Sequence, residues 1–334
     1  MSRVHFLNVS PGDCTVIEHN SGRVSVVDVC SGYEDENRLL KVVMESAGNF
    51  RRADWPTNPI DYMQRIGVKY VHRFIGTHPD MDHLDGFDKL AETLAITNLW
   101  HTGVTREKPP FGRGSRFKEA DWDRYERVRA GLEKTTSLEL VAGAKFRYAN
   151  QNVENETDID GLHILAPSPS LVAQAGATGD MNDASYVVLY RSAGGKILFT
   201  GDAHDDTFDY VMEHYSRAIS NCTVLIAPHH GRHSDRDHAF LDVVNPSLTL
   251  FGYAPSEHLA YQAWNDRGLR KITSNQAGDV VLECADNMIN VYVENSHLIA
   301  DVGGDVSIKN DLGYVWYGRF GTRAEAVAVA VAVA

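Results

Sequence analysis

The sequence predicts a mixed α/β fold in which β-sheets pack face to face and helices cover their outer sides. Short β-rich runs dominate the first thirty residues, and strands and helices alternate farther along the chain. The chain has 334 residues, of which 43% are hydrophobic and 23% charged, as in a globular protein with a sizeable core. These features favour one domain over residues 1–320.

The N-terminal part is expected to form a β-meander followed by a helix. Its predicted strands cover residues 4–9, 14–17 and 24–29. Turn-forming Pro, Gly, Asp and Asn residues separate them. Apolar residues recur at helical spacing between Leu39 and Met44, which predicts a helix over 35–47. A strand is expected over 70–76 and a helix over 85–94.

The stretch from about 103 to 135 reads as an insertion packed over one edge of the domain. It contains Pro109-Pro110 and ends in a predicted helix over 117–132. Between 104 and 130, eight Lys and Arg residues stand against five Asp and Glu residues, with aromatic residues among them. Such a segment suits contact with single-stranded nucleic acid, or a lid over a small nucleotide.

The second half of the chain is predicted to alternate strands with helices. The expected strands cover residues 162–165, 186–190, 196–200, 224–227, 248–251 and 280–283. The expected helices lie near 204–217, 236–244 and 259–267. Alternating Ala and Val follow Glu325, so residues 321–334 are expected to be either a non-native or disordered tail or a native edge strand, and the functional prediction does not use them.

Charge and cysteine content exclude several classes of protein. A net charge of −13 argues against coating DNA through a basic surface, although not against a nuclease with a locally basic groove. No apolar run is long enough to span a bilayer and no secretory signal is visible, so a cytoplasmic protein without membrane contact is expected. Four widely spaced cysteines argue against a thiolate zinc knuckle and a dense disulfide framework. The oligomeric state is left open.

The sharpest functional signal is the run Thr77-His78-Pro79-Asp80-Met81-Asp82-His83, directly after a predicted strand. Carboxylates are costly to bury and imidazoles are good metal ligands, so this cluster favours a divalent cation site. The alternative is a solvated acidic turn that caps the following helix.

Two further loops at strand ends carry residues of the ligand type. Asp202 follows the apolar strand that ends in Thr200-Gly201, and taken alone it is equally a helix N-cap. Residues 228–233 also follow an apolar strand and contain three histidines. Because strand ends on one edge of a sheet converge, the three loops together supply ligands for two cations. Asn182 or Asp183 would add an amide or a carboxylate.

The order of these motifs resembles the metallo-β-lactamase superfamily, and within it the ComEC-type branch, named for the hydrolase-like domain of a DNA-uptake competence protein. The resembling motifs are His78-x-Asp80-x-Asp82-His83, Asn182-x-x-Ser185, Thr200-Gly201-Asp202 and Pro228-His229-His230-Gly231. Residues 6–13 and Val27-Asp28 also resemble the first hairpin of that branch. The resemblance covers about residues 3–293 and implies an αββα sandwich with a dinuclear metal site at one sheet edge.

The resemblance also implies roles for individual residues. The implied metal ligands are His78, Asp80, Asp82, His83, Asn182, Asp202 and His230, with Asp202 as the bridge between two ions. Asp80 stands where the superfamily more commonly has histidine, and the usual histidine near Asn182 is missing. One metal position is therefore expected to be weak or oxygen-rich, with zinc and manganese as the candidate metals.

Catalytic and substrate-binding roles follow in the same way. Asp82 would orient the attacking water, and His233 or His258 would protonate the leaving oxygen, with a surface role as the alternative for both histidines. Arg232 stands where the branch usually has serine, and it would bind a phosphate through two hydrogen bonds or form a surface salt bridge. Ser185 and His229 are the other expected substrate contacts.

The leading functional hypothesis is hydrolysis of a phosphodiester, in a nucleic acid or a nucleotide, by water that two divalent cations activate. A carboxylic ester, thioester or lactone hydrolase is the second interpretation, because the same activated water attacks carbonyl carbons. A catalytically degenerate binding or sensor module is the third, and the missing histidine favours it. The acidic surface is also compatible with a protein partner that directs cleavage.

Overall fold

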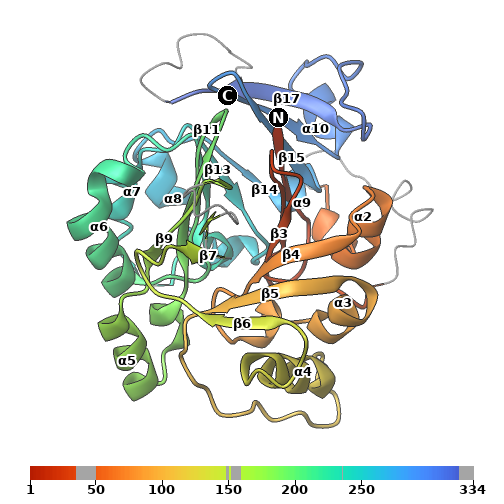
Figure 1. Cartoon of the computed structure of the whole chain (residues 1–334). Coiled ribbons are helices and arrows are strands. Elements are labelled where there is room, and N and C mark those ends of the chain that lie inside the picture. The colour runs from red at the N-terminus through yellow and green to blue at the C-terminus, as the bar shows by residue number, and fades with distance from the viewer. Residues whose placement is uncertain (35–49, 148–149, 152–158, 235, 323–334) are drawn as a thin grey trace.

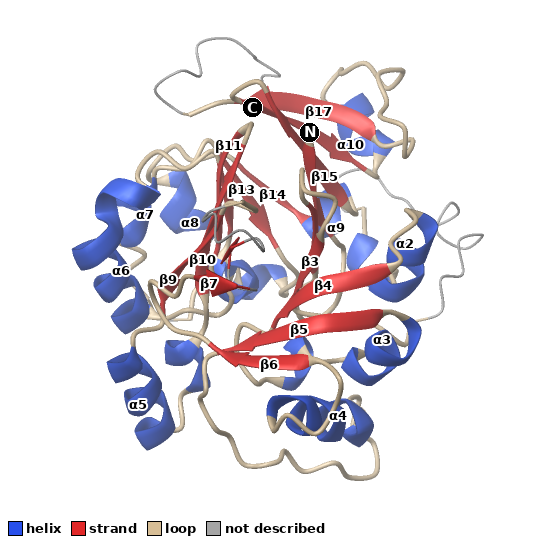
Figure 2. Ribbon diagram, viewed as in Figure 1, coloured by secondary structure: helices blue, strands red, loops and turns tan. Residues whose placement is uncertain are grey.

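The computed structural model describes residues 1–34, 50–147, 150–151, 159–234 and 236–322. Two β-sheets face each other at its centre, and helices cover the outer face of each (Figure 1, Figure 2). The mixed α/β class and the αββα layering expected from the sequence are confirmed. The helix expected over 35–47 and the tail from residue 323 onward lie outside the described residues.

The first sheet has nine strands in the order β17-β16-β15-β1-β2-β3-β4-β5-β6. They are β1 (Ser2–Phe6), β2 (Thr15–Glu18), β3 (Val24–Val27), β4 (Tyr70–Ile75), β5 (Ala95–His101), β6 (Thr136–Glu139), β15 (Val280–Ala285), β16 (Met288–Val293) and β17 (Val315–Phe320). The meander β1-β2-β3 is antiparallel, as expected, whereas β3 to β6 are parallel. The sequence patterns missed β5, β6, β16 and β17.

The second sheet has six strands in the order β14-β13-β12-β11-β10-β9. They are β9 (Leu162–Ala166), β10 (Val187–Ser192), β11 (Gly195–Phe199), β12 (Val224–Ile226), β13 (Leu248–Phe251) and β14 (Lys271–Thr273). Strands β11 to β14 are parallel, so their C-terminal ends share one edge. The short strands β7 (Phe146–Arg147) and β8 (Asn150–Gln151) form a separate pair.

Alternation along the strands separates the hydrophobic core into layers, because successive side chains point to opposite faces of a sheet. Ile75 and Trp100 belong to the cluster between the two sheets, whereas their neighbours Phe74 and Leu99 belong to the cluster beneath the outer helices of the first sheet. The second sheet alternates in the same way, so both of its faces are buried.

Helices form the two outer layers (Figure 2). Those against the first sheet are α2 (Pro59–Arg65), α3 (Phe87–Thr93) and α4 (Glu119–Arg129); those against the second are α6 (Asp205–Ile219), α7 (Phe240–Val244) and α8 (Tyr261–Asn265). The remaining helices are α5 (Pro169–Thr178), α9 (Ser274–Ala277) and α10 (Ser296–Asp301). None of the helices in the described ranges is both long and apolar enough to cross a lipid bilayer.

The segment 103–135, expected as an insertion, connects the parallel strands β5 and β6. Its helix α4 buries Trp122, Tyr125 and Val128 in the cluster beneath the first sheet. Parallel neighbours need such a crossover, so α4 is part of the outer layer. The irregular chain before α4 passes close to the loop that follows β4, where Arg106 contacts Asp80.

Candidate metal centre

Loops from both sheets meet at the edge where several parallel strands end. His78 and His83 follow β4 of the first sheet, and the three residues Met81–His83 form a 3-10 turn. Asp202 follows β11 and His230 follows β12, which are neighbours in the second sheet. The three loops predicted from the sequence therefore converge, although 152 positions separate His78 from His230 along the chain.

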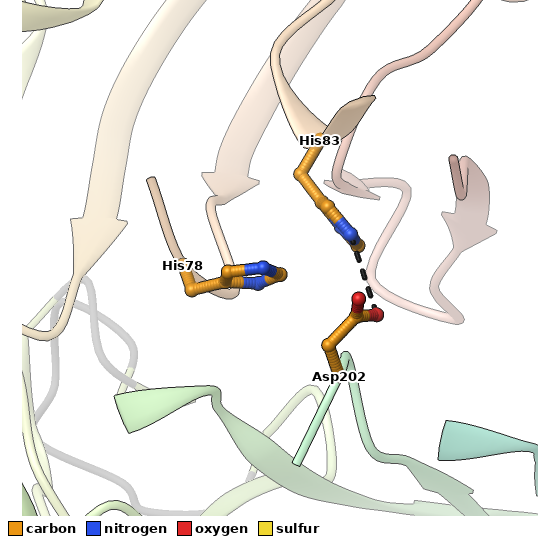
Figure 3. Close-up of side chains that lie close together, drawn as sticks. All are labelled: His78, His83 and Asp202. Carbon is orange, nitrogen blue, oxygen red and sulfur yellow. Dashed lines mark ion pairs between the residues drawn. The ribbon is translucent and has the colours of Figure 1, made fainter. Parts of the chain in front are cut away.

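Asp202 lies at the middle of this group. Its Oδ1 is 3.3 Å from Nε2 of His83, and its Oδ2 is 3.7 Å from Nε2 of His230. Asp82, whose side chain is partly exposed, lies beside His230, with its Oδ2 at 3.6 Å from Nε2 of that ring. Figure 3 shows that His78, His83 and Asp202 point toward one another. The two oxygens of Asp202 therefore face different imidazoles.

The backbone around His230 is strained in a way that delivers its side chain to the centre. His229 and His230 have φ angles of 51° and 59°, in the left-handed region that non-glycine residues seldom adopt. Two such residues in succession persist only where the surrounding structure holds them. Directly after β13, a Cβ at Gly252 would lie 2.8 Å from Oδ1 of Asp13 and 3.1 Å from the His230 Cβ, so glycine leaves room for both side chains.

Two buried carboxylates that were not predicted as site residues support the histidines. Oδ2 of Asp28 lies 2.8 Å from Nδ1 of His83 and accepts the hydroxyl of Thr77 at 2.7 Å. Oδ2 of Asp13 lies 3.2 Å from Nδ1 of His230. Both belong to the N-terminal segments, residues 6–13 and Val27-Asp28, that resemble the first hairpin of the ComEC-type branch. The signal that identifies Asp28 is a carboxylate placed directly after an apolar strand.

The centre contains polar atoms that the described part of the chain leaves without hydrogen-bond partners. These are Nε2 of His78, His83 and His230 and Oδ1 of Asp202. A buried polar atom without a partner costs about 1–3 kcal/mol. Ligand atoms lie within 4.8 Å of one another in three groups: His78, His83 and Asp202; Asp82, His83 and His230; and Asp13, Asp202 and His230. Imidazole and carboxylate donors aimed at a common space fit divalent cations such as zinc or manganese.

The charges of these groups are strongly interdependent. Burial lowers the pKa of His83 and His230, but the negative charge of Asp202 and its neighbours outweighs burial and holds both pKa values well above the usual range. The same imidazoles hold the pKa of Asp202 well below its usual value despite its burial. Burial lowers the pKa of His78 to about 3, so this imidazole is neutral and has a lone pair to donate.

Two predicted ligands lie at the margin of the group. Oδ2 of Asp80 is 3.9 Å from Nε2 of His78, and its other oxygen accepts a hydrogen bond from Arg106. The side-chain amide of Asn182 lies 3.2 Å from Nε2 of His204. Both residues are therefore engaged with partners that the sequence analysis did not identify.

Ser185, predicted to contact substrate, instead forms a hydrogen bond with the backbone of Asp202. It is fully buried, and its hydroxyl accepts the backbone N–H of Asp202 at 3.3 Å. Because this bond fixes the chain at Asp202, Ser185 orients the central carboxylate in this structure.

A cavity of about 350 Å³ adjoins the centre; it is lined by His229, Arg232, His233, Ser234, Glu257 and His258. His229 lies between the cavity and the metal centre, since its Nε2 is 3.6 Å from Oδ2 of Asp202. Nε of Arg232 is buried and has no hydrogen-bond partner in the described ranges. Four residues predicted for substrate binding or proton transfer thus lie together, beside the ligand group.

Comparisons with known proteins identify the fold. No protein-family model and no curated protein matches the chain. A solved metal-dependent hydrolase of the β-lactamase superfamily matches with a TM-score of 0.50 at 12% identity, over 86% of this chain and all of that one. The metallo hydrolase Igni18 from the archaeon Ignicoccus hospitalis gives 0.48 at 12%, over 84% and 99% of the two chains.

The diiron β-hydroxylase CmlA from Streptomyces venezuelae gives a TM-score of 0.46 at 13% identity, over 84% of this chain and 54% of that one. The match with a TM-score of 0.50, together with the two facing sheets, gives the chain the fold of the metallo-β-lactamases. Membership of the ComEC-type branch stays a prediction from the sequence motifs.

Proposed function

We propose that this metallo-β-lactamase fold acts as a metal-dependent hydrolase of phosphodiesters, in nucleotides or nucleic acids. The observation that carries the proposal is the convergence of buried imidazole and carboxylate atoms at one edge of the two sheets, where several of these atoms form no hydrogen bond within the described residues. His78, His83, Asp82, Asp202 and His230 would hold two divalent cations, zinc or manganese. When bound, such cations polarise phosphoryl oxygens and bring the pKa of water toward neutrality.

Asp82 would orient the attacking water. Its side chain is 28% exposed, whereas the side chain of Asp202 is 5% exposed, so Asp82 lies at the boundary between the buried centre and solvent. A carboxylate at this boundary can accept a hydrogen bond from water and align the oxygen for attack. His78 and His83 are both buried, so Asp82 is more accessible to water than either imidazole.

Arg232 in the adjoining cavity favours an anionic substrate, and Glu257 is the one acidic residue among the lining residues. Arg232 carries a permanent charge and a planar set of donors that matches a phosphate group. His229 would contact the same group from the side of the metal centre. His233 and His258, joined by a 2.7 Å backbone hydrogen bond, lie where a leaving oxygen could take up a proton. A lactone or a neutral ester offers no negative charge for this cavity to bind.

The test measures metal content and hydrolysis on the same preparations. The protein is loaded with Mn²⁺ or Zn²⁺ and assayed with bis(p-nitrophenyl) phosphate, a single-stranded oligonucleotide, a lactone and a thioester. We expect phosphodiester cleavage that falls more than about 100-fold in Asp202→Asn and His230→Gln, together with a loss of bound metal. His214→Gln, on the exposed side of α6, is the matched control and should retain both.

Other outcomes would replace the proposal. Turnover of the lactone or the thioester alone would make the protein a carboxylic ester hydrolase. Full metal content with no turnover of any substrate would identify a binding or sensor module. Equal cleavage by the wild type and Asp202→Asn would show that Asp202 is not part of the active site.

A further inference from the structure

We infer that Arg106 weakens one of the two cation positions by competing for Asp80, so that the centre holds one cation tightly and a second one loosely. The inference rests on the metal binding in the proposed function and is independent of the substrate. Its basis is the unequal supply of donor atoms on the two sides of Asp202, together with the ion pair that Asp80 already forms.

The position near His230 is complete without Asp80. Asp82, His83 and His230 present ligand atoms within 4.8 Å of one another, and Asp202 faces the same space. Nε2 of His230 is 3.6 Å from Asp82 and 3.7 Å from Asp202. This position therefore has two carboxylates and two imidazoles, which would supply the four ligands that zinc usually takes.

The position near His78 has fewer donors left. Once His83 binds the first cation, the donors that remain for the second cation are His78 and the second oxygen of Asp202. Asn182, the other predicted ligand on this side, has its amide 3.2 Å from His204. Oδ2 of Asp80, 3.9 Å from Nε2 of His78, is then the donor that would complete the second position.

Arg106 pairs with the other oxygen of this carboxylate and so competes with a cation for its negative charge. Its guanidinium forms an ion pair with Oδ1 of Asp80, and both side chains are about one-third exposed, at 36% and 31%. A guanidinium stays protonated at every pH at which proteins fold, so Arg106 can pair with Asp80 wherever that carboxylate is ionised. A cation that binds beside His78 must either displace Arg106 or accept a weakened carboxylate.

The chain around Arg106 is anchored on both sides. Two residues earlier, Val104 is buried in a small apolar cluster, and its carbonyl accepts a 2.8 Å hydrogen bond from Arg129. Two residues later, Lys108 forms two ion pairs of 2.6 Å with carboxylates of α4. Since these anchors fix the backbone, the arginine is presented to the loop after β4 rather than left free on the surface.

Metal titration tests the inference without relying on activity. Metal-free protein is titrated with Mn²⁺ by calorimetry, and bound metal is counted by elemental analysis. We expect one tight site and a second at least about tenfold weaker in the wild type, and a second site tightened about tenfold in Arg106→Gln. Electron paramagnetic resonance of the doubly loaded variant should show coupling between neighbouring Mn²⁺ ions.

Two further variants make the result specific. Arg113→Gln removes the same charge from an exposed position in the same segment, and its second site should match the wild type. Asp80→Asn should abolish the second site with or without Arg106. Two equal sites in the wild type, or equal tightening in Arg113→Gln and Arg106→Gln, would overturn the inference. A wild type that binds no cation at all would refute the proposed function itself, which is a different result.

Discussion

Asp28 and the Nδ1 atom of His83 form a buried 2.8 Å hydrogen bond that leaves Nε2 of His83 facing Asp202. Because a carboxylate accepts, Nδ1 carries the proton and, in the neutral ring, Nε2 offers its lone pair to the centre. The backbone N–H of Thr77 donates to the other oxygen of Asp28 at 2.8 Å, so the carboxylate itself cannot rotate. The imidazole is therefore oriented before any cation binds.

This relationship predicts that Asp28→Asn weakens metal binding without unfolding the protein. The amide can turn its NH₂ group toward Nδ1, which favours the wrong tautomer of His83. Loss of such a supporting carboxylate typically lowers metal affinity by about 10–100-fold. Competition with a chromophoric chelator measures the change, and Asp61→Asn, at an exposed position on α2, is the control. Unchanged affinity in Asp28→Asn would show that the bond does not orient His83.

Gly231→Ala should destabilise the turn that carries His230. Gly231 has φ of 88°, and a Cβ there would lie 2.4 Å from the ring of Phe251, which is fully buried. Strain and overpacking of this kind cost about 1–3 kcal/mol. Urea unfolding measures the loss. Gly112→Ala, where a Cβ meets no described atom within 4 Å, should leave the midpoint unchanged. Equal midpoints for the two variants would refute the argument.

The fold is predicted to be sensitive to the loss of either partner of one buried ion pair. Arg73 of β4 pairs with Asp160, and both side chains are fully buried. Asp160→Asn removes the negative charge that faces the buried guanidinium of Arg73, so it should lower the free energy of unfolding by about 3–5 kcal/mol at pH 7.

The pH dependence of that loss has a definite sign. Burial raises the pKa of Asp160, but Arg73 outweighs it and holds the pKa well below the usual value. A depressed carboxyl pKa stabilises the fold fully above the unfolded pKa of about 3.9, and the gain disappears as pH falls toward the folded pKa. The difference between wild type and Asp160→Asn should stay constant from pH 8 to 5 and shrink below about pH 4. A constant difference down to pH 2 would contradict this.

Protonation of His101 is predicted to reduce the stability of the fold at a higher pH than protonation of Asp160 does. Its ring is buried, accepts the N–H of Gly103 at Nδ1, and lies 3.0 Å from the Ser137 hydroxyl at Nε2. Burial, with a smaller contribution from Arg129, lowers the pKa of His101 to about 4. The unfolded chain then binds a proton first, so stability falls as pH drops from about 6.5 to about 4, by up to about 1.4 kcal/mol per pH unit.

Urea midpoints at pH 7, 5.5 and 4.5 test this point in metal-free protein, where cation release plays no part. His101→Gln should show a flatter dependence than the wild type, whereas the exposed variant His214→Gln should follow the wild type. Parallel curves for His101→Gln and the wild type would show that His101 does not titrate as proposed.

The strands that the sequence missed differ in how visible they are. Residues Met288–Val293 of β16 alternate between half-buried and buried positions, a pattern that periodicity alone can detect. Strand β6 lies at a sheet edge, and none of its residues is fully buried, so its sequence carries no such pattern. Helix α4 was predicted from its sequence, but its role as a crossover became visible only once β5 and β6 were known to be parallel.

The sequence by itself determined the layered α/β class and the three strand-end loops that carry His78, His83, Asp202 and His230. Alternating side chains and turn residues are local signals, and the chain records them within a few positions. Tertiary structure alone decided that Asp28 and Asp13 support the imidazoles, that Asn182 turns to His204, and that Asp80 pairs with Arg106. The physical reason is that the direction of a loop side chain depends on partners delivered by distant strands, and no periodicity along the chain encodes which partner arrives.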